Sequence, residues 1–455
     1  MPFKDECGVF GIWPGREASR QAYLGLYALQ HRGQEAAGIC TRHEGVLHLH
    51  KGQGYVADVF TPEILDQLPG DAAIGHTRYS TTGGNVASAA HPFLVEGRFG
   101  QLALCHNGNL TNTERLRASL LEEGQLFSSP SDSEVILALI NRAEADTLEG
   151  AIVEALRQVE GAFSLLILSE EALFAVRDPH GLRPLALGSL EGGWVLSSET
   201  CAFDLLGARY EREIEPGEVL VLGARGSRSL FPREPVQAKP CVFEHVYFAR
   251  PDSYVFSRSV LATRREMGRR LAAVHPVEAD FVVPVPDSGV HAALGYAEAS
   301  QTPFEFGLIR NHYVGRTFIE PKQSIRSFGV KVKLNPVRDL LRDKRVVLVD
   351  DSIVRGTTSR KIVQMVREAG AREVHLRISS PPTTHSCFYG IDTPTRDQLI
   401  ASHKSVEEIR AFIGADTLAY LSLGDLETSV KDPGGCGFCY ACFTGAYPIP
   451  PAPLG

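Results

Sequence analysis

The stretch Arg345-Val-Val-Leu-Val-Asp-Asp-Ser-Ile-Val-Arg-Gly-Thr-Thr-Ser359 decides the fold of the second half of the chain. After Arg345, the four residues 346–349 form an apolar run that is typical of a buried strand. A helix-like pattern follows at 359–369, and another apolar run follows at 373–378. Strand, loop, helix and strand at this spacing predict parallel strands joined by crossover helices, an α/β fold that binds ligands at the carboxyl ends of its strands.

The same order of elements occurs earlier in the chain. An apolar run at 281–285 precedes the turn Pro286-Asp287-Ser288-Gly289, and a helix-like pattern covers 290–299. Both loops therefore follow predicted strands, where ligands bind in such folds. Taken alone, the tetrapeptide 286–289 is equally compatible with a plain turn.

The loop after the strand at 345–349 carries chemistry suited to a sugar phosphate. Gly356 and the hydroxyl residues around it stand at the start of a helix, where backbone amides bind phosphate well. Asp350 and Asp351 would repel a bare phosphate, so we expect them to serve a cation or neutral hydroxyl groups such as a sugar diol. No Lys follows Gly356, which excludes the common nucleotide-binding loop. The alternative is a capped helix that happens to follow two acids.

The first half of the chain has a different pattern of apolar runs and helices. Short apolar runs at 102–105, 163–168 and 219–222 are bounded by turn residues, and helical patterns cover 133–145 and 148–159. This combination predicts an α+β domain with substantial β-sheet. Three prolines within 231–240 exclude a helix or a central strand there, and we place the domain boundary in this segment.

Composition limits the class of protein. The chain has 455 residues, of which 44% are hydrophobic and 22% charged, as in ordinary globular domains. Its 46 basic and 54 acidic residues give a net charge of −8, which argues against a general nucleic-acid binder. No apolar run approaches a membrane span, and the start MPFKDE lacks the basic and then apolar pattern of a signal peptide. We therefore expect a cytoplasmic protein.

One cysteine near the amino terminus is a candidate nucleophile. Cys7 follows six residues without an evident structural role. If residues 1–6 were removed as a propeptide, the freed α-amino group could act as the base for its own thiol. The alternative is that Cys7 is a buried small residue.

Four downstream residues supply the other parts of an amide-cleaving site. Arg78 can bind a substrate carboxylate, and Asp132 can bind an α-ammonium group. Asn107 and the backbone amide of Gly108 can form an oxyanion hole. Carboxylate, ammonium and oxyanion together describe glutamine as the substrate. Taken singly, the charged residues could form surface ion pairs, and Asn-Gly is a common turn.

The remaining cysteines include a candidate metal site. Two overlapping C-x-x-C pairs occur in Cys436-Gly-Phe-Cys439-Tyr-Ala-Cys442, and Cys241 and Cys387 lie far upstream. The number of thiolates cannot distinguish a Cys₄ zinc site from a four-iron cluster, and the residues alone slightly favour zinc.

These motifs resemble known families. Five segments of the first half resemble the class II glutamine amidotransferases: 7–12, 31–38, 75–80, 106–110 and 131–134. In the second half, 346–359 resembles the phosphoribosyl-pyrophosphate motif of the type I phosphoribosyltransferases. Their combination is similar to the glutamine phosphoribosylpyrophosphate amidotransferase family over nearly the whole chain. The resemblance implies an N-terminal-nucleophile glutaminase domain of stacked antiparallel sheets between helices at 7–230. A linker at 231–240 and an α/β type I phosphoribosyltransferase domain with a cluster-ligand segment at 241–455 would follow.

The resemblance also implies roles for residues of the second half. Asp350 and Asp351 would hold the ribose hydroxyls and, with Ser288, help to bind Mg²⁺. The basic segment 311–333 would close over the sugar phosphate, although a solvated loop is the alternative. Further contacts to phosphoribosyl pyrophosphate would come from Asp287, Ser288, Gly289, Arg316, Lys322, Ser352, Arg355, Gly356, Thr357 and Thr358.

One branch of this family combines a cleaved propeptide with a 4Fe-4S cluster, and residues 1–6 are similar to its propeptide. By this resemblance Cys241, Cys387, Cys439 and Cys442 would hold the cluster, with zinc as the alternative. Arg32 would lie near the nucleophile, and Tyr247 could line a path for ammonia.

The implied reaction transfers ammonia from glutamine to 5-phosphoribosyl 1-pyrophosphate, giving 5-phosphoribosylamine, glutamate and pyrophosphate in the first committed step of purine synthesis. Purine nucleotides would inhibit it, and the protein would be a homotetramer. Another class II amidotransferase, such as an asparagine or glucosamine phosphate synthase, is the alternative enzyme, against which 350–359 argues. A non-catalytic phosphoribosyl-fold regulator of nucleic acid and a metal-stapled interaction module are the alternatives from other classes.

Overall fold

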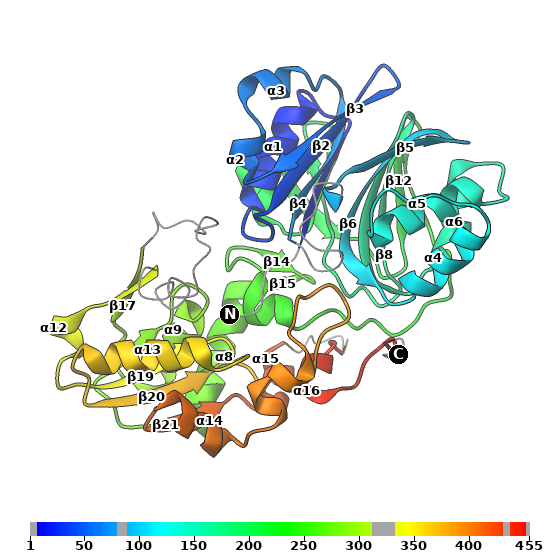
Figure 1. Ribbon diagram of the computed structural model, residues 1–455. Helices are drawn as coiled ribbons and strands as arrows, with labels where there is room; N and C mark the ends of the chain where they lie inside the picture. The colour runs from blue at the N-terminus through cyan, green and yellow to red at the C-terminus, as the bar shows by residue number, and fades with distance from the viewer. Residues whose placement is uncertain (1–6, 80–88, 312–332, 431–436, 452–455) are drawn as a thin grey trace.

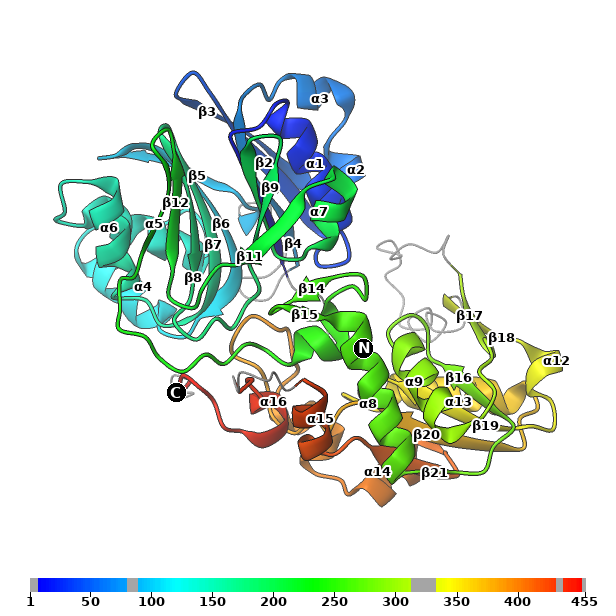
Figure 2. The same cartoon turned by 180° about the vertical axis from the view of Figure 1, so that it is seen from behind.

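The fold was analysed in a computed structural model that describes residues 7–79, 89–311, 333–430 and 437–451. The chain forms two lobes, and Figures 1 and 2 show them from opposite sides. The blue-to-green first lobe contains two large sheets, and the second lobe contains a smaller sheet flanked by helices.

The first lobe contains a seven-stranded and a six-stranded sheet with antiparallel neighbours. The strand orders are β11-β9-β10-β1-β4-β2-β3 and β13-β12-β8-β7-β6-β5. The strands are β1 (Gly8–Trp13), β2 (Ala36–His43), β3 (Val46–Gln53), β4 (Ala72–Arg78), β5 (Phe93–Gly97), β6 (Gly100–Leu110), β7 (Gly161–Ser169), β8 (Ala172–Arg177), β9 (Ala186–Leu190), β10 (Gly193–Ser197), β11 (Arg209–Glu213), β12 (Val219–Gly223) and β13 (Gly226–Leu230).

The two sheets stack face to face because their inner faces are apolar. Val9 and Ile74 of one sheet share a buried cluster with Leu166 and Leu220 of the other. Helices cover the two outer faces, so the lobe has four layers, as Figure 1 shows. This arrangement confirms the predicted glutaminase-type fold. The helices are α1 (Ala18–Ala28), α2 (Val56–Val59), α3 (Pro62–Asp66), α4 (Thr113–Glu122), α5 (Asp132–Arg142), α6 (Leu148–Leu156) and α7 (Cys201–Leu206).

The second lobe is built on a parallel sheet in the order β16-β19-β20-β21. Its central strand β19 alternates its side chains between two cores. Val347 and Val349 pack with α8 and α9, whereas Val346 and Leu348 pack with α13 and α14. The parallel α/β prediction is thereby confirmed. The elements are β16 (Phe281–Pro284), β19 (Arg345–Asp350), β20 (Glu373–Ile378), β21 (Thr417–Tyr420), α8 (Val260–Val274), α9 (Val290–Ser300), α13 (Thr357–Glu368) and α14 (Val406–Ile413).

Smaller elements complete the second lobe. The hairpin β14-β15 lies on the side that faces the first lobe, as the two ribbon views show. A π-helical turn contacts the first lobe through the ion pair of Glu244 with Arg32. These elements are η2 (Glu244–Phe248), β14 (Tyr254–Val255), β15 (Arg258–Ser259), β17 (Leu308–Arg310), β18 (Leu334–Pro336), α12 (Arg338–Leu341), η3 (Arg396–Gln398), η4 (Ile400–Ser402), α15 (Leu423–Ser429) and α16 (Ala441–Thr444).

Some predicted boundaries were wrong by a few residues. The helix expected at 359–369 begins at Thr357 because Gly356 adopts a left-handed conformation and caps it. The helix expected at 133–145 ends at Arg142. Residues 231–240 form neither helix nor strand and connect β13 to the second lobe.

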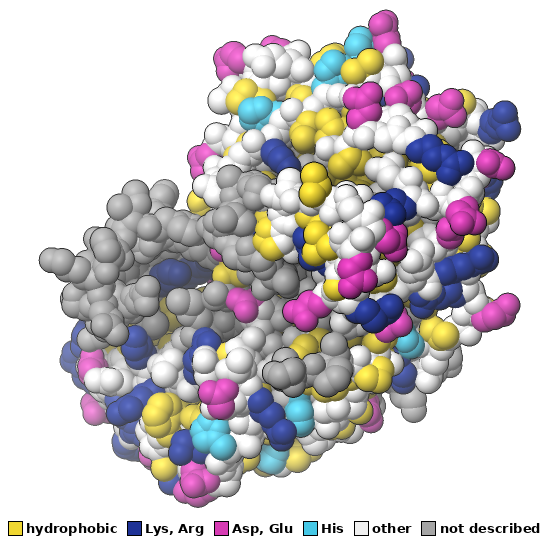
Figure 3. Space-filling view, turned by 45° about the vertical axis from the view of Figure 1, so that its right-hand side comes forward, with side chains coloured by type: hydrophobic (Ala, Val, Ile, Leu, Met, Phe, Trp, Pro, Cys, Tyr) yellow, Lys and Arg dark blue, Asp and Glu magenta, His cyan; other side chains and the backbone are white. Residues whose placement is uncertain are grey.

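The surface and the helices set limits on membrane contact and charge. Within the described ranges, every helix is too short or too polar to cross a bilayer. On the face in Figure 3, acidic and basic side chains are interspersed over both lobes. This mixture accords with the modest net charge of −8.

Candidate active sites

Cys7 lies at the entry to β1, at the end of the first lobe that faces the second. β4, which pairs with β1, ends at Arg78, and the Cys7 thiol donates a weak hydrogen bond to the Tyr79 carbonyl oxygen at 3.5 Å. Burial raises the pKa of the Cys7 thiol, while Tyr79 and the charges of Arg78 and Arg32 oppose this rise. The thiol therefore needs a local base to ionise near neutral pH. The predicted propeptide, 1–6, lies outside the described residues.

Asp132 provides a buried negative charge close to this thiol. It is the first residue of α5, and its carboxylate accepts a hydrogen bond from the Leu110 amide at 3.0 Å. Burial raises the pKa of Asp132, but His106, Leu110 and Ser133 together outweigh that effect and hold it below its usual range. Asp132 is therefore ionised at neutral pH and can bind an ammonium group. Both Arg78 and Asp132 affect the pKa of Cys7, so the three predicted residues lie in one site.

Asn107 and Gly108 lie near the end of β6, between His106 and Leu110, which both contact Asp132. The Asn107 side chain is only 2% exposed, and its Nδ2 is buried without a hydrogen-bond partner in the described part of the chain. A buried amide donor without a partner is costly, which fits a group that binds a ligand. Gly108 has a φ of +145°, and a Cβ there would lie 2.0 Å from the Ala162 carbonyl oxygen. Only glycine fits this position.

Two histidines near these residues, His76 and His106, are buried. His76 is hydrogen bonded to the His106 carbonyl oxygen at 2.9 Å, and burial lowers its pKa to about 3. His106 contacts Asp132 at 3.4 Å and the Ser133 hydroxyl at 3.2 Å. His106 therefore helps to fix the Asp132 carboxylate.

A buried ionic network joins the first site to the second lobe. Arg32, which is 1% exposed, donates from Nε to the Cys7 carbonyl oxygen at 3.1 Å. Its other nitrogens are paired with Glu199 at 2.6 Å and with Glu244 of η2 at 2.8 Å. Arg183 is paired with the same Glu244 carboxylate at 2.5 Å. The guanidinium that touches the nucleophile is thus held by both lobes.

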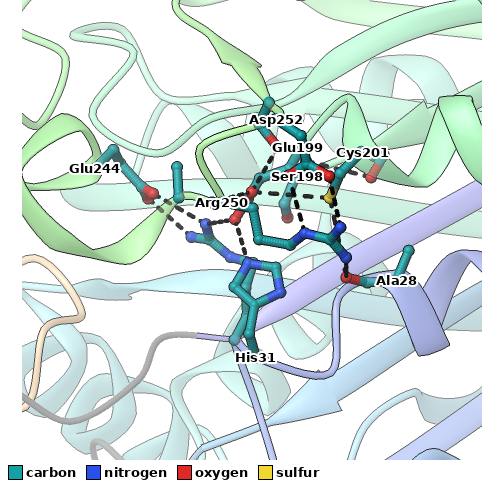
Figure 4. Close-up of polar contacts among 12 residues, drawn as sticks. Ala28, His31, Ser198, Glu199, Cys201, Glu244, Arg250 and Asp252 are labelled. Carbon is teal, nitrogen blue, oxygen red and sulfur yellow. Dashed lines mark hydrogen bonds and ion pairs between the residues drawn. The ribbon is translucent and has the colours of Figure 1, made fainter. Parts of the chain in front are cut away.

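Figure 4 shows the wider surroundings of this network. Glu199 accepts hydrogen bonds from His31 at 2.8 Å and from the Arg250 backbone amide at 2.9 Å. Arg250 in turn is paired with Asp252 at 2.5 Å. Arg32 lies near the nucleophile, as the family resemblance implied, whereas Glu199 and Glu244 were not predicted from the sequence. The only available signal was a charged residue inside an apolar run, as in Val242-Phe-Glu244-His-Val246.

The second site lies at the carboxyl edge of the parallel sheet. β16 and β19 pair in parallel through Pro284 and Val349, which brings their following loops together. The Ser288 hydroxyl donates to Asp351 at 2.5 Å, and the Ser352 hydroxyl donates to the same carboxylate. The two loops, each expected at the carboxyl end of a strand, therefore meet at this edge of the sheet.

Asp350 and Asp351 are both buried, and neither has an ion-pair partner among the residues that the structure describes. Burial raises the pKa of Asp350 well above its usual value, and the neighbouring Asp351 charge raises it further. Burial also raises the pKa of Asp351, although the hydrogen bonds from Ser288 and Ser352 partly lower it. Two adjacent buried carboxylates would be stabilised by a cation, and Mg²⁺ prefers such oxygen ligands.

The remaining predicted residues of this site differ in position. Gly356 has a φ of +73° and caps α13, whose first backbone amides belong to Thr357 and Thr358. Arg355 is hydrogen bonded through its guanidinium to the Gln398 side chain at 2.6 Å, and Asp287 is paired with Arg310. A Cβ at Gly289 would lie 2.3 Å from the Val349 carbonyl oxygen, so the loop touches β19. Arg316 and Lys322 lie outside the described residues.

Four cysteines of the second lobe, Cys241, Cys387, Cys439 and Cys442, lie close together near the first lobe. Cys241 and Cys439 are paired in a short parallel bridge, and the Cys439 amide donates to the Pro240 carbonyl oxygen at 2.8 Å. The Cys387 sulfur accepts a hydrogen bond from the Tyr389 amide at 3.3 Å. Burial raises the pKa of Cys442 well above its usual value, and the other three thiols raise it further, so all four are electrostatic neighbours. None of the four forms a disulfide.

Comparisons with known proteins agree on one family. A sequence profile described as a glutamine amidotransferase domain matches residues 76–204. The chain is 50% identical to an amidophosphoribosyltransferase of Bacillus subtilis over 448 residues, covering 98% of this chain and 94% of that protein. It is 53% identical to an amidophosphoribosyltransferase of Synechococcus elongatus, covering 98% of this chain and 92% of that protein.

Solved structures give the same result. The glutamine phosphoribosylpyrophosphate amidotransferase of Bacillus subtilis, solved in complex with ADP and GMP, superimposes with a TM-score of 0.93 at 49% identity, covering 98% of both chains. A structure described as the allosteric regulatory enzyme of purine biosynthesis superimposes with a TM-score of 0.94 at 49% identity, covering 98% of this chain and 97% of that one. The sequence identity, the two-lobed fold and the two sites together show that this chain belongs to the amidophosphoribosyltransferase family.

Proposed function

We propose that the chain divides the family's reaction between its two lobes. The first lobe releases ammonia from glutamine, and the second lobe attaches that ammonia to 5-phosphoribosyl 1-pyrophosphate, in the first step of purine synthesis. The single observation that carries the proposal is the buried, unpartnered Nδ2 of Asn107 beside a site with a thiol, a carboxylate and a guanidinium. Those four groups match the parts of glutamine that change or are bound.

In the first lobe, Cys7 acts as the nucleophile after removal of residues 1–6. The freed α-amino group takes the thiol proton, and the sulfur attacks the side-chain amide carbon of glutamine. Asn107 Nδ2 and the Gly108 amide donate hydrogen bonds to the resulting oxyanion. Ammonia leaves with the proton, and water then cleaves the thioester to give glutamate and the free thiol.

Arg78 and Asp132 select glutamine over other amides. The buried Arg78 guanidinium binds the α-carboxylate, and the ionised Asp132 binds the α-ammonium group. Because both charges lie inside a site from which water is largely excluded, each contact is stronger than it would be on the surface. A primary amide that lacks these two groups should therefore be a poor substrate.

In the second lobe, Asp350 and Asp351 hold the ribose hydroxyls and, with Ser288, are the residues that would hold Mg²⁺. When bound, Mg²⁺ neutralises charge on the departing pyrophosphate. Ser352 and the first turn of α13, including Thr357 and Thr358, bind the 5-phosphate through hydroxyl groups and backbone amides. Ammonia attacks C1 of the sugar, the bond to pyrophosphate breaks, and the ammonium nitrogen loses a proton to give 5-phosphoribosylamine.

Ammonia must cross from one lobe to the other. The turn η2 supplies Glu244 to the first site, and the buried Arg264 donates to the His245 carbonyl oxygen at 2.8 Å. Arg264 is also an electrostatic neighbour of Asp351 in the second site. The segment that contains Tyr247 therefore lies between the two sites and supports a path for ammonia along this turn.

Cys241, Cys387, Cys439 and Cys442 would hold a 4Fe-4S cluster with a structural role. A single zinc ion requires its thiolates within about 2.3 Å of one point. The Cys442 thiol has the other three thiols as electrostatic neighbours, so the four could serve one metal site. The thiols alone fit either metal, and the resemblance to the cluster-containing branch favours the cluster, with zinc as the alternative.

Regulation by purine nucleotides is part of the proposal because a related enzyme has been solved with ADP and GMP. The homotetramer and the cytoplasmic location expected from the sequence stay predictions.

A paired assay with glutamine and with ammonia as nitrogen donors tests the function. Cys7→Ala should abolish product formation from glutamine and leave formation from ammonia, because the second site is untouched. Cys40→Ala, at a buried thiol between the two sheets, is the matched control and should keep both activities. Use of glutamine by Cys7→Ala would overturn the nucleophile, and absence of both activities in the unaltered protein would overturn the function. An active preparation whose mass includes residues 1–6 would contradict the propeptide.

A further inference from the structure

A loop of the second lobe touches the strand that carries the oxyanion donors of the first. Asn109, the residue after Gly108 in β6, donates from its side-chain amide to the Phe388 carbonyl oxygen at 3.0 Å. The two residues are separated by 279 positions in the sequence, so this bond joins the two lobes. Phe388 follows Cys387 and precedes Gly390, and we call residues 387–390 the cysteine loop.

The second contact is between two glycine backbones. Gly390 has a φ of +105°, and a Cβ at this position would lie 3.0 Å from both the Cα and the carbonyl carbon of Gly108. A Cβ at Gly108 would lie 2.0 Å from the Ala162 carbonyl oxygen of the neighbouring strand β7. Gly108 is therefore in close contact with both this strand and the cysteine loop.

The cysteine loop is itself fixed in place. Tyr389 packs in a buried apolar cluster with Ala162 and Leu182 of the first lobe and with Cys439 and Ala441 of the second. The Tyr389 hydroxyl donates to the Ile449 carbonyl oxygen at 2.5 Å, which ties the loop to the C-terminal segment. A loop held in this way can restrain the strand that it touches.

We propose that the cysteine loop positions the oxyanion hole, with Asn109 and Gly390 as positioning residues for glutamine hydrolysis. The inference rests on the proposed function, because it assumes that the Gly108 amide binds the oxyanion. An oxyanion donor contributes only where its N–H points at the developing charge, and small displacements weaken it. The second lobe would thus set the rate of the first site through backbone contact.

The first test replaces Gly390 with alanine. Gly390→Ala should lower kcat for glutamine hydrolysis by about tenfold to a hundredfold with little change in KM, because the displaced amide acts on the transition state. Gly226→Ala is the matched control, since Gly226 also has a positive φ, +92°, but has nothing within 4 Å of its Cβ position. Equal kcat values for the two variants would overturn the inference. Formation of product from ammonia reports folding and should be preserved in both.

A second variant and a binding measurement distinguish a displaced oxyanion hole from a misfolded protein. Asn109→Ala removes the bond to Phe388 without adding bulk, and kcat should fall in the same direction. An aldehyde analogue of glutamine forms a tetrahedral adduct with the Cys7 thiol, whose oxygen occupies the oxyanion hole. Its inhibition constant should rise about tenfold in Gly390→Ala, while inhibition by glutamate stays unchanged. A parallel loss of both would overturn the positioning role, whereas absence of hydrolysis in the unaltered protein would instead overturn the proposed function.

Discussion

The Arg32 guanidinium of the first lobe lies 2.8 Å from the Glu244 carboxylate of the second, and both side chains are buried. The same Arg32 donates to the Cys7 carbonyl oxygen, and Arg183 is also paired with Glu244. Two arginines therefore share the Glu244 carboxylate at the interface, and Arg32 has Glu199 as a second partner. Burial lowers the pKa of Arg32, but the charges of Glu244 and Glu199 outweigh this and raise it above its usual value.

Removal of the Glu244 charge should destabilise the interface strongly. Glu244→Gln keeps the size of the side chain but leaves two buried guanidinium groups with one less counter-charge. We expect a loss of about 3–5 kcal/mol in the free energy of unfolding, measured by urea denaturation. Glu407→Gln, at an ion pair whose glutamate is 74% exposed, is the control and should change stability by less than about 1 kcal/mol. Similar values for the two variants would contradict the importance of the buried network.

The sequence predicted the second site better than this interface, for a physical reason. Parallel strands end at one edge, so the loops that begin at Pro286 and Asp350 had to meet there. Glu244 gave no comparable signal, because its partner Arg32 is 212 residues away in the other lobe and no local pattern pairs them. The helix start at Thr357 was also missed, because hydroxyl side chains favour caps and loops and the left-handed Gly356 is visible only in the fold.

In the first site, too, the sequence predicted the functional residues but not their surroundings. The motif residues Arg78, Asn107 and Asp132 could be selected from the sequence because each lies in a short polar segment between apolar runs. Their environment could not be predicted, because the low pKa of Asp132 depends on His106 and on the Leu110 amide. The contact of Gly390 with Gly108 depends on how two lobes dock, which no local pattern encodes.

Asn107→Ala should slow glutamine hydrolysis without weakening glutamine binding. The Asn107 Nδ2 has no partner within the described structure, so it is available to the oxyanion, to which a donor bonds more strongly than to a neutral amide oxygen. Loss of one such donor reduces kcat by about 10²–10³. Steady-state kinetics should show this fall with KM changed by less than about threefold. Asn112→Ala, which removes a side-chain bond to the Gln158 carbonyl oxygen away from the site, is the control. A rise in KM alone would assign Asn107 to substrate binding.

The buried His76 should make stability depend on pH. Its pKa is about 3 in the fold because of burial, against about 6.5 when unfolded, so the unfolded chain binds one more proton between these values. The contribution of His76 to stability is therefore fully present above about pH 6.5 and falls by about 1.4 kcal/mol per pH unit below it. Urea denaturation at pH 7.5 and 5.5 should show a smaller fall in His76→Gln, which keeps a donor for the His106 carbonyl oxygen. An identical fall in the variant and the parent would contradict this assignment.

The assigned cluster ligands predict a difference between two nearby cysteines. Cys442→Ser should remove the visible absorption and most of the iron of protein prepared without air, because Cys442 lies with Cys241, Cys387 and Cys439. Cys436→Ser changes a thiol of the same C-x-x-C run and should keep both. Metal analysis and the absorption spectrum of the two variants provide the measurement. Zinc in place of iron in active protein would contradict the cluster, and loss of iron in Cys436→Ser would change the ligand set.

Asp351→Asn should impair the Mg²⁺-dependent second site and leave glutamine hydrolysis in the first site unchanged. Asp351 lies next to Asp350 and accepts hydrogen bonds from Ser288 and Ser352. The substitution keeps the shape but halves the buried negative charge, so more Mg²⁺ is needed and product formation from ammonia should fall at least about a hundredfold at fixed Mg²⁺. Basal glutamine hydrolysis, measured without the sugar phosphate, should stay within about twofold of the parent because Cys7 and Asn107 are in the other lobe. Asp339→Asn, at an exposed carboxylate of α12, is the matched control and should change neither activity. An unchanged Mg²⁺ dependence in Asp351→Asn would show that this carboxylate does not serve the cation.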